Sequence, residues 1–150
     1  MGKASLALLG VVACITLGYA AGKKEVVEIS AAELKWTEVP ETGGVQVAPL
    51  WGEMMKGAHG AMAKFPPGST HPLHTHTPDL KVVVVSGGFT YGTEGGPEKV
   101  YGPGSYLMIP GGTKHTSGCA AGAPCLLFQE GSAKFDMKLV GAPAAKLPKK

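Results

Sequence analysis

Four histidines fall in two short segments of the chain, at spacings suited to binding a transition metal. His74 and His76 are separated by one residue, so in a β-strand both imidazoles point to the same face. His115 follows a Pro-Gly-Gly turn and becomes a third ligand if its segment pairs beside the first. Three imidazoles suit Fe, Zn, Mn, Ni or Cu, so we expect a divalent transition metal. His71 lies before Pro72, out of phase with His74, and we expect it outside the metal group.

A histidine pair in a strand can also lie on an ordinary exposed surface, so the pair alone does not predict a metal site. The fifth histidine, His59, is ambiguous in the same way. It could line the interior beside the metal, but histidines are not usually core residues, and we expect it at the surface.

Short strands must position these side chains. Apolar or alternating runs recur between Gly- and Pro-containing turns. They cover residues 45–51, 60–65, 80–86, 89–91, 99–101, 105–109, 125–129 and 134–140. One helical turn is expected over residues 31–36, with Ser30 as its N-cap and Glu33 three positions later. Many short strands at close spacing predict an all-β fold, an antiparallel sandwich or barrel.

The composition fits one globular domain and argues against a nucleic-acid binder. At 150 residues a single domain is expected. The hydrophobic fraction of 44% argues against a disordered chain. The formal net charge is only +3, and the sequence contains no Arg, the side chain best suited to bidentate phosphate contacts. We therefore expect no nucleic-acid partner.

The N-terminus has the pattern of an export signal. Lys3 precedes an apolar run over residues 6–20, shorter than the ~20 residues that a membrane span usually needs. Gly18 and Ala20 are small residues at the positions that a signal peptidase requires. An uncleaved anchor and lipidation at Cys14 are the alternatives, although the apolar run continues well past Cys14.

The expected boundaries are a signal peptide over residues 1–20, a domain over residues 21–140 and a flexible Ala/Pro/Lys-rich tail over residues 141–150. After cleavage no stable membrane span remains, and the protein is expected to be periplasmic or secreted. In that oxidising compartment Cys119 and Cys125 are candidates for a local disulfide across a Gly- and Pro-containing turn. The alternative is two small half-buried thiols.

Two motifs in the central third of the chain resemble those of the cupin superfamily. The first motif has the form G-x5-H-x-H-x3,4-E-x6-G, and it is matched by Gly68, His74, His76 and Gly88, with Lys81 at the glutamate position. The second has the form G-x5-P-x-G-x2-H-x3-N, and it is matched by Gly104, Pro110, Gly112 and His115, with Cys119 at the asparagine position. Only 15 residues separate the two motifs.

More narrowly, the chain is similar to an uncharacterised cupin family, DUF4437, close to the anti-sigma (ChrR-type) cupin domains. This resemblance is carried by Leu50-Trp51-Gly52 with Lys56-Gly57, by Lys64-Phe65-Pro66-Pro67-Gly68, by Pro72-Leu73-His74-Thr75-His76 and by Lys134-Phe135-Asp136. It implies a single-domain double-stranded β-helix, or jelly-roll barrel, with a metal inside the barrel mouth. It also implies a homodimer as a frequent state.

Lys81 marks the main departure from the cupin pattern, because a protonated lysine cannot replace a glutamate ligand. One hypothesis is a three-histidine site with open positions, as in thiol dioxygenases and diketone-cleaving cupins. In a second, Asp79 replaces the glutamate; in a third, the metal is lost and the barrel only binds a small molecule. We expect Lys81, Val83 and Val85 to face inward, so that Lys81 acts as a catalytic acid or base or holds an anionic ligand. The alternative is that Lys81 extends into solvent.

Two classes of function remain open. One is a metal-dependent enzyme, a dioxygenase-like oxygenase or an isomerase acting on a small acidic or carbonyl compound, with substrate and O2 reaching open metal positions. The other is a non-catalytic module that senses or binds a small molecule or metal, as the similarity to anti-sigma cupin domains suggests. The expected export argues against a cytoplasmic sigma-factor role.

Overall fold

The structure, a computed structural model, describes residues 25–141. The predicted signal peptide (residues 1–20) and residues 142–150 of the predicted tail lie outside the described residues. Apart from a short 3-10 turn, η1 (Ala31–Glu33), the regular elements are all strands, as predicted. In chain order these are β1 (Thr37–Glu38), β2 (Gln46–Gly52), β3 (His59–Phe65), β4 (Thr70–Thr75), β5 (Leu80–Ser86), β6 (Phe89–Thr93), β7 (Lys99–Tyr101), β8 (Tyr106–Ile109), β9 (His115–Cys119), β10 (Cys125–Gly131) and β11 (Lys138–Leu139).

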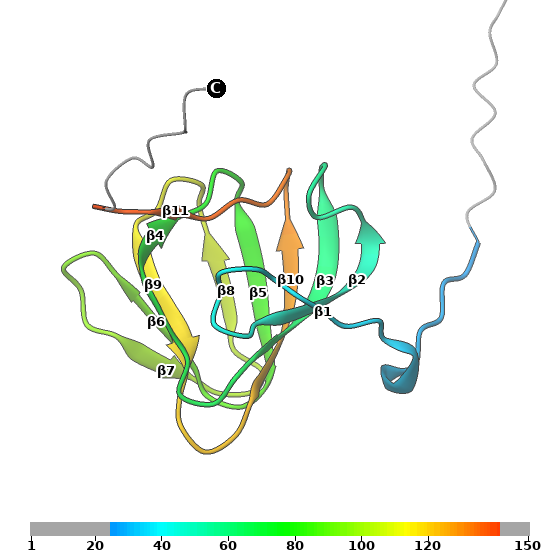
Figure 1. Ribbon diagram of the computed structural model, residues 1–150, viewed down its shortest axis with the longest axis horizontal. Helices are drawn as coiled ribbons and strands as arrows, with labels where there is room; N and C mark the ends of the chain where they lie inside the picture. The colour runs from blue at the N-terminus through cyan, green and yellow to red at the C-terminus, as the bar shows by residue number, and fades with distance from the viewer. Residues whose placement is uncertain (1–24, 142–150) are drawn as a thin grey trace, which may run out of the picture.

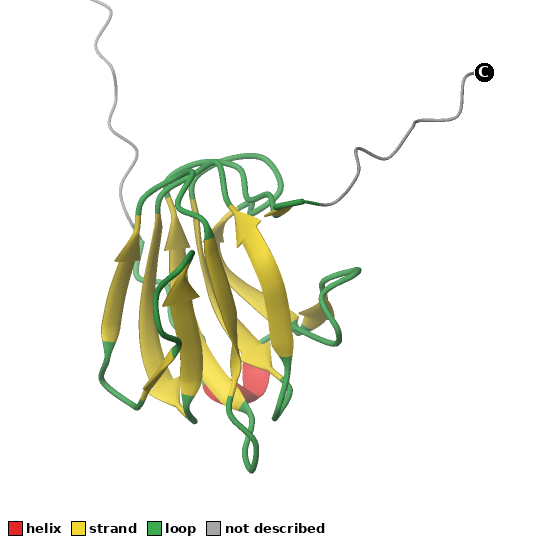
Figure 2. Cartoon of the chain, turned by 90° about the vertical axis from the view of Figure 1, so that its left-hand side faces the viewer, coloured by secondary structure: helices red, strands yellow, loops and turns green. Residues whose placement is uncertain are grey.

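The strands form two antiparallel sheets that face each other (Figures 1 and 2). One sheet has the order β1-β2-β3-β10-β5-β8, and the other has the order β11-β4-β9-β6-β7. From β3 onward the chain passes repeatedly from one sheet to the other. This alternation builds a jelly-roll barrel with the core between the sheets, the fold that the resemblance to cupins implies.

Strand alternation decides which side chains enter that core. On β5, Leu80, Val82 and Val84 are buried, whereas Lys81 and Val85 are exposed. The expectation that the odd-numbered residues of this strand face inward is therefore wrong by one position. Because side chains alternate along a strand, that one-residue error moves every side chain to the opposite face.

The C-terminal segment also differs from the prediction. A strand is expected over residues 134–140, but only Lys138–Leu139 pairs, with β4. Residues 132–137, here called the strap, instead cross one end of the barrel on the way to β11 (Figure 1). The backbone N–H of Phe135 donates to the carbonyl of Met54, and Phe135 and Met137 line the interior. Because Phe135 and Met137 point into the barrel and the Phe135 backbone bonds to Met54, this segment does not pair with a neighbouring strand.

A disulfide joins the two sheets at one end of the barrel. Cys119 ends β9 in one sheet and Cys125 begins β10 in the other, and their Cα atoms are 5.8 Å apart. The structure thus confirms the local disulfide hypothesis over the free-thiol alternative. Within residues 25–141, no helix is long and apolar enough to cross a bilayer.

Candidate metal centre

The pairing of β4 with β9 brings the predicted histidines together. His74 and His115 are direct cross-strand partners, and their ring centroids are 4.2 Å apart. His76 follows the end of β4, and its ring centroid lies 4.9 Å from that of His74 and 5.2 Å from that of His115. One nitrogen of each ring lies within 4.8 Å of the other two. The expected cluster of these three residues is confirmed.

Each of the three rings is held by a backbone carbonyl through its Nδ1 atom. His74 Nδ1 donates to the carbonyl of Pro72 at 2.7 Å, and His115 Nδ1 donates to that of Thr113 at 2.8 Å. His76 Nδ1 donates to the carbonyl of Asp136 on the strap. These bonds place the proton of each neutral ring on Nδ1, which leaves the Nε2 lone pair for a metal.

Burial keeps the three rings neutral at physiological pH. Desolvation by burial is the main cause of the low pKa of His74, about 4. The same cause lowers the pKa of His76 and of His115. A metal binds only unprotonated imidazole, so this donor set fits a divalent transition metal without a proton having to leave first.

His71 lies outside the metal group, as expected, but it does face the interior. The ladder between β4 and β9 is irregular between His71 and His74, and this irregularity turns both side chains inward. His71 Nε2 donates to the carbonyl of Thr42 at 2.9 Å, and its Nδ1 lies 3.4 Å from the hydroxyl of Ser117. Both ring nitrogens are therefore used within the protein, which explains why His71 does not join the metal group.

Lys81 does not reach the cavity, so the catalytic role predicted for it has no structural basis. Its side chain is 54% exposed on the outer face of the sheet, where it forms an ion pair of 2.7 Å with Glu130. The hydrogen bond and charge of Glu130 raise the pKa of Lys81. The amine therefore stays protonated and cannot act as a base with a lowered pKa.

Leu80 occupies the inward position at which the cupin pattern places a glutamate. It is 3% exposed, lines the cavity and is separated from His76 by three residues, one of the two spacings that the motif allows. The suggested substitute, Asp79, is exposed, and its carboxylate accepts a hydrogen bond from the backbone N–H of Gly111. Among residues 25–141, no carboxylate joins the histidine group.

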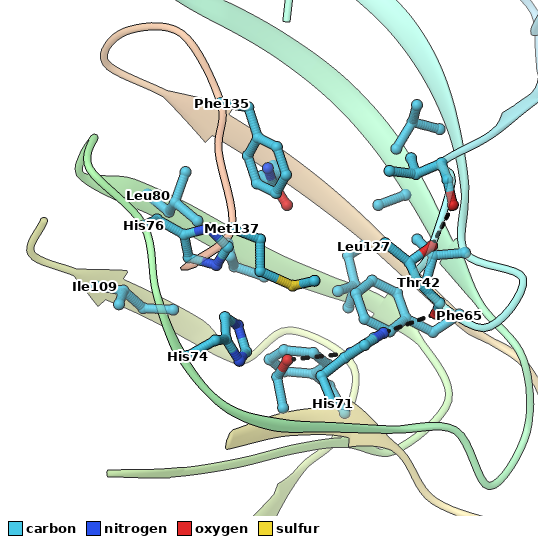
Figure 3. Close-up of a pocket in the computed structure, with 18 of the residues that line it drawn as sticks. Thr42, Phe65, His71, His74, His76, Leu80, Ile109, Leu127, Phe135 and Met137 are labelled. Atoms are coloured by element: carbon cyan, nitrogen blue, oxygen red, sulfur yellow. Dashed lines mark hydrogen bonds between the residues drawn. The ribbon is translucent and has the colours of Figure 1, made fainter. Parts of the chain in front are cut away.

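The cavity between the sheets is mainly apolar (Figure 3). His74, His76 and Met137 turn toward it from one side, with Leu127 and Phe65 opposite. The strap closes one end, since the ring centroid of Phe135 lies 4.9 Å from that of His76. The free space is about 60 Å³, room for a few water molecules or a compact ligand.

His59 is not a surface residue, contrary to expectation. It is 1% exposed, and its ring lies against Gly131, where an added Cβ would come within 2.3 Å of the ring. Its Nδ1 bonds to the carbonyl of Gly57, and its ring packs edge-on against Phe135. The only sequence signal for this burial is that Gly131 leaves space for the ring.

Three cavity residues, on the strap and on β10, were not predicted from the sequence. Phe135, Met137 and Gln129 all line the cavity. Lys134-Phe135-Asp136 carries part of the family resemblance, which was a signal for the strap. Nothing in the local pattern around Gln129 marks it, since an isolated glutamine in a strand usually faces solvent.

Comparison with known proteins gives one family match. The family model described as "ChrR Cupin-like domain" matches residues 24–133. No curated protein matches the chain at a significant level.

Several solved structures share the fold. The polyketide cyclase RemF from Streptomyces resistomycificus superposes with a TM-score of 0.68 at 17% identity, covering 80% of this chain and 89% of that one. KdgF from Halomonas sp. gives 0.56 at 20% identity, with 69% and 92% covered. The DMSP lyase DddQ from Ruegeria pomeroyi DSS-3 gives 0.60 at 19% identity, with 77% and 64% covered. At these identities the similarity establishes the fold alone.

Proposed function

The chain belongs to the ChrR Cupin-like domain family, and on this premise we propose that it binds a divalent transition metal and uses it to act on a small molecule. His74, His76 and His115 are the proposed ligands. Fe, Zn, Mn, Ni and Cu all suit three imidazoles, and metal analysis of the purified protein identifies which of them is bound.

One observation carries the proposal of an enzyme: three orientated imidazoles face a cavity in which Leu80 stands where a fourth ligand would be. Structural zinc sites are normally closed by four protein ligands, whereas catalytic sites keep a position open. A metal bound here would supply Lewis-acid or redox chemistry at a substrate oxygen. The reaction class that we propose is an oxygenation or isomerisation.

The protein's own residues contribute orientation and exclusion of water. Backbone carbonyls hold the three rings in one tautomer. Phe135 lies beside His76 and separates the metal position from solvent at that end of the barrel. Such shielding strengthens electrostatic interactions inside a site.

We propose that the ligand binds through an anionic or oxygen-bearing group. Lys81 does not support this proposal, because its side chain lies outside the barrel. The support is instead that three neutral imidazoles leave the charge of a dication uncompensated. A ligand carrying one negative oxygen would offset that charge.

A sensor or binding module is the second candidate function. The family match favours it, because the family is named after ChrR and ChrR-type cupins resemble anti-sigma domains. The two candidates differ in turnover. The test is metal analysis of the full chain purified without a His-tag, followed by O2 consumption with thiols, diketones and phenols. Stoichiometric metal with turnover supports the enzyme; ligand binding without turnover supports the module.

We also propose export, with residues 1–20 as signal peptide, residues 21–140 as the domain and residues 141–150 as tail. The Cys119–Cys125 disulfide supports this, because disulfides persist in oxidising compartments.

A homodimer is proposed as well. Its support is the apolar side chains exposed on the outer face of the six-stranded sheet, Tyr106, Met108 and Val85 among them. Intact mass of exported material tests the first proposal, and light scattering tests the second.

A further inference from the structure

The cavity lining carries no charged side chain. Apart from the three clustered histidines, its polar residues are Thr42, His71, Ser117 and Gln129. Three of these four are already bonded within the protein. The hydroxyl of Thr42 donates to the carbonyl of Val39, and His71 bonds to both the Thr42 carbonyl and Ser117.

Gln129 is different, because its amide makes no side-chain hydrogen bond to another residue among residues 25–141. On β10 it lies in the inward row between Leu127, which is 1% exposed, and Gly131. Its cross-strand partners are Ala61 on β3 and Val82 on β5. The histidines project from the opposite sheet into the same cavity.

Gln129 is only partly buried, and the fully buried side-chain atoms without a hydrogen-bond partner in the described part of the chain are His59 Nε2 and Ser69 Oγ. The Gln129 amide is therefore free to exchange a water molecule for a ligand in the cavity. Two apolar neighbours on its own sheet give it no partner there. The open direction is the cavity, toward the sheet that carries the proposed metal ligands. The amide N–H groups can donate to an oxygen in that space.

We infer that Gln129 is the ligand-orienting residue of this cavity, donating a hydrogen bond to an anionic oxygen held at the three-histidine site. The ligand class is a compact monoanion with an apolar body, such as a short monocarboxylate. A second charge on the ligand would meet only apolar side chains and would be rejected. The inference rests on the metal site proposed above, and it adds the ligand class and the residue that selects it.

The test uses the full chain loaded with Co2+, whose visible absorption reports its coordination. Sodium butyrate and sodium succinate are titrated as probes, because they match in chain length and differ in the second carboxylate. We expect butyrate to bind at least tenfold tighter than succinate. Gln129→Leu should weaken butyrate binding at least tenfold, the factor expected when a hydrogen bond to a charged group is lost. Co2+ affinity should change less than twofold.

Gln46→Leu is the matched control, since Gln46 lies on β2 and outside the cavity lining. It should bind butyrate as the unmodified chain does. If Gln129→Leu loses its secondary structure by circular dichroism, Gln129→Met, which keeps the length of the side chain, replaces it and must show the same loss.

The outcomes separate the two proposals. Absence of cobalt bands in the unmodified chain overturns the metal site, and this inference with it. Cobalt bands with equal butyrate affinity in the Gln129 variants overturn only the role of Gln129. Succinate binding as tight as butyrate binding overturns the monoanion class.

Discussion

The imidazole of His76 donates its Nδ1 proton to the backbone carbonyl of Asp136, a residue 60 positions further along the chain. A proposed metal ligand is thus orientated by the strap that closes its cavity. The strap is anchored in turn by the Asp136 carboxylate, which accepts from the backbone N–H and the hydroxyl of Thr77, both at 2.6 Å. Lys138 completes the anchor at 3.2 Å from the same carboxylate.

Asp136→Ala should therefore weaken metal binding without removing a ligand. Partial burial raises the pKa of Asp136, but hydrogen bonds from Thr77 and Lys138 outweigh it and lower the pKa below its usual value. The carboxylate is ionised at neutral pH, and its loss frees the strap and the His76 ring. Loss of such an outer contact typically costs tenfold or more in metal affinity, so we expect about tenfold for Zn2+.

Zn2+ titration calorimetry measures this effect, and long-range 1H–15N spectra of the imidazole report whether the His76 proton leaves Nδ1. Glu53→Ala is the control, because it removes an exposed carboxylate that pairs with Lys56. Equal Zn2+ affinity in all three proteins would show that the strap does not position His76.

The stability of the metal-free protein should fall on acidification between about pH 6.5 and pH 4. Burial lowers the pKa of His74 from 6.5 to about 4, and it lowers those of His76 and His115. The unfolded chain therefore binds more protons in this window, and the folded state loses stability as pH falls. For His74 alone the loss is on the order of 3 kcal/mol.

Urea unfolding of metal-free protein at pH 8, 6 and 4.5 measures this dependence. His74→Leu removes the titrating ring and should flatten the curve over the same range. A free energy of unfolding that is constant from pH 8 to pH 4.5 would contradict buried, neutral histidines.

Much of the metal centre follows from period-two alternation. The spacing of His74 and His76 is enough to put both on one face, and the second motif correctly indicated His115 as their neighbour. The strand over residues 80–86 was also predicted with the bounds that the structure shows. These features depend on local pattern and short turns, which a sequence displays directly.

The face of β5 could not be decided in the same way. The motif allows three or four residues after His76, so either Leu80 or Lys81 fits it. Four successive valines follow, and a run that is apolar on both faces gives no alternation to fix the register. Burial of His59 and Gln129 depends on packing between segments distant in sequence, which no local pattern records.

The disulfide gives a third prediction. Under non-reducing conditions, denatured exported protein should show no alkylation of Cys119 or Cys125 by intact mass. The double variant Cys119→Ser/Cys125→Ser should lose about 2 kcal/mol of unfolding free energy, since the closed loop is short. Alkylation of both residues in unreduced material would contradict the bond that joins the two sheets.

The last prediction compares two neighbouring positions of β5. Leu80→Glu places a carboxylate on the inward face beside the three histidines, where it can complete a four-ligand site. We expect Zn2+ to bind at least tenfold tighter than in the unmodified chain, and the metal-free variant to be less stable because the new charge is buried. Lys81→Glu introduces the same residue one position later, on the outer face opposite Glu130. There it replaces an exposed ion pair by a like-charged pair, which costs about 1 kcal/mol or less and leaves Zn2+ affinity unchanged. Competition with a chromophoric chelator measures both affinities, and tighter binding by Lys81→Glu rather than Leu80→Glu would reverse the assignment of the two faces.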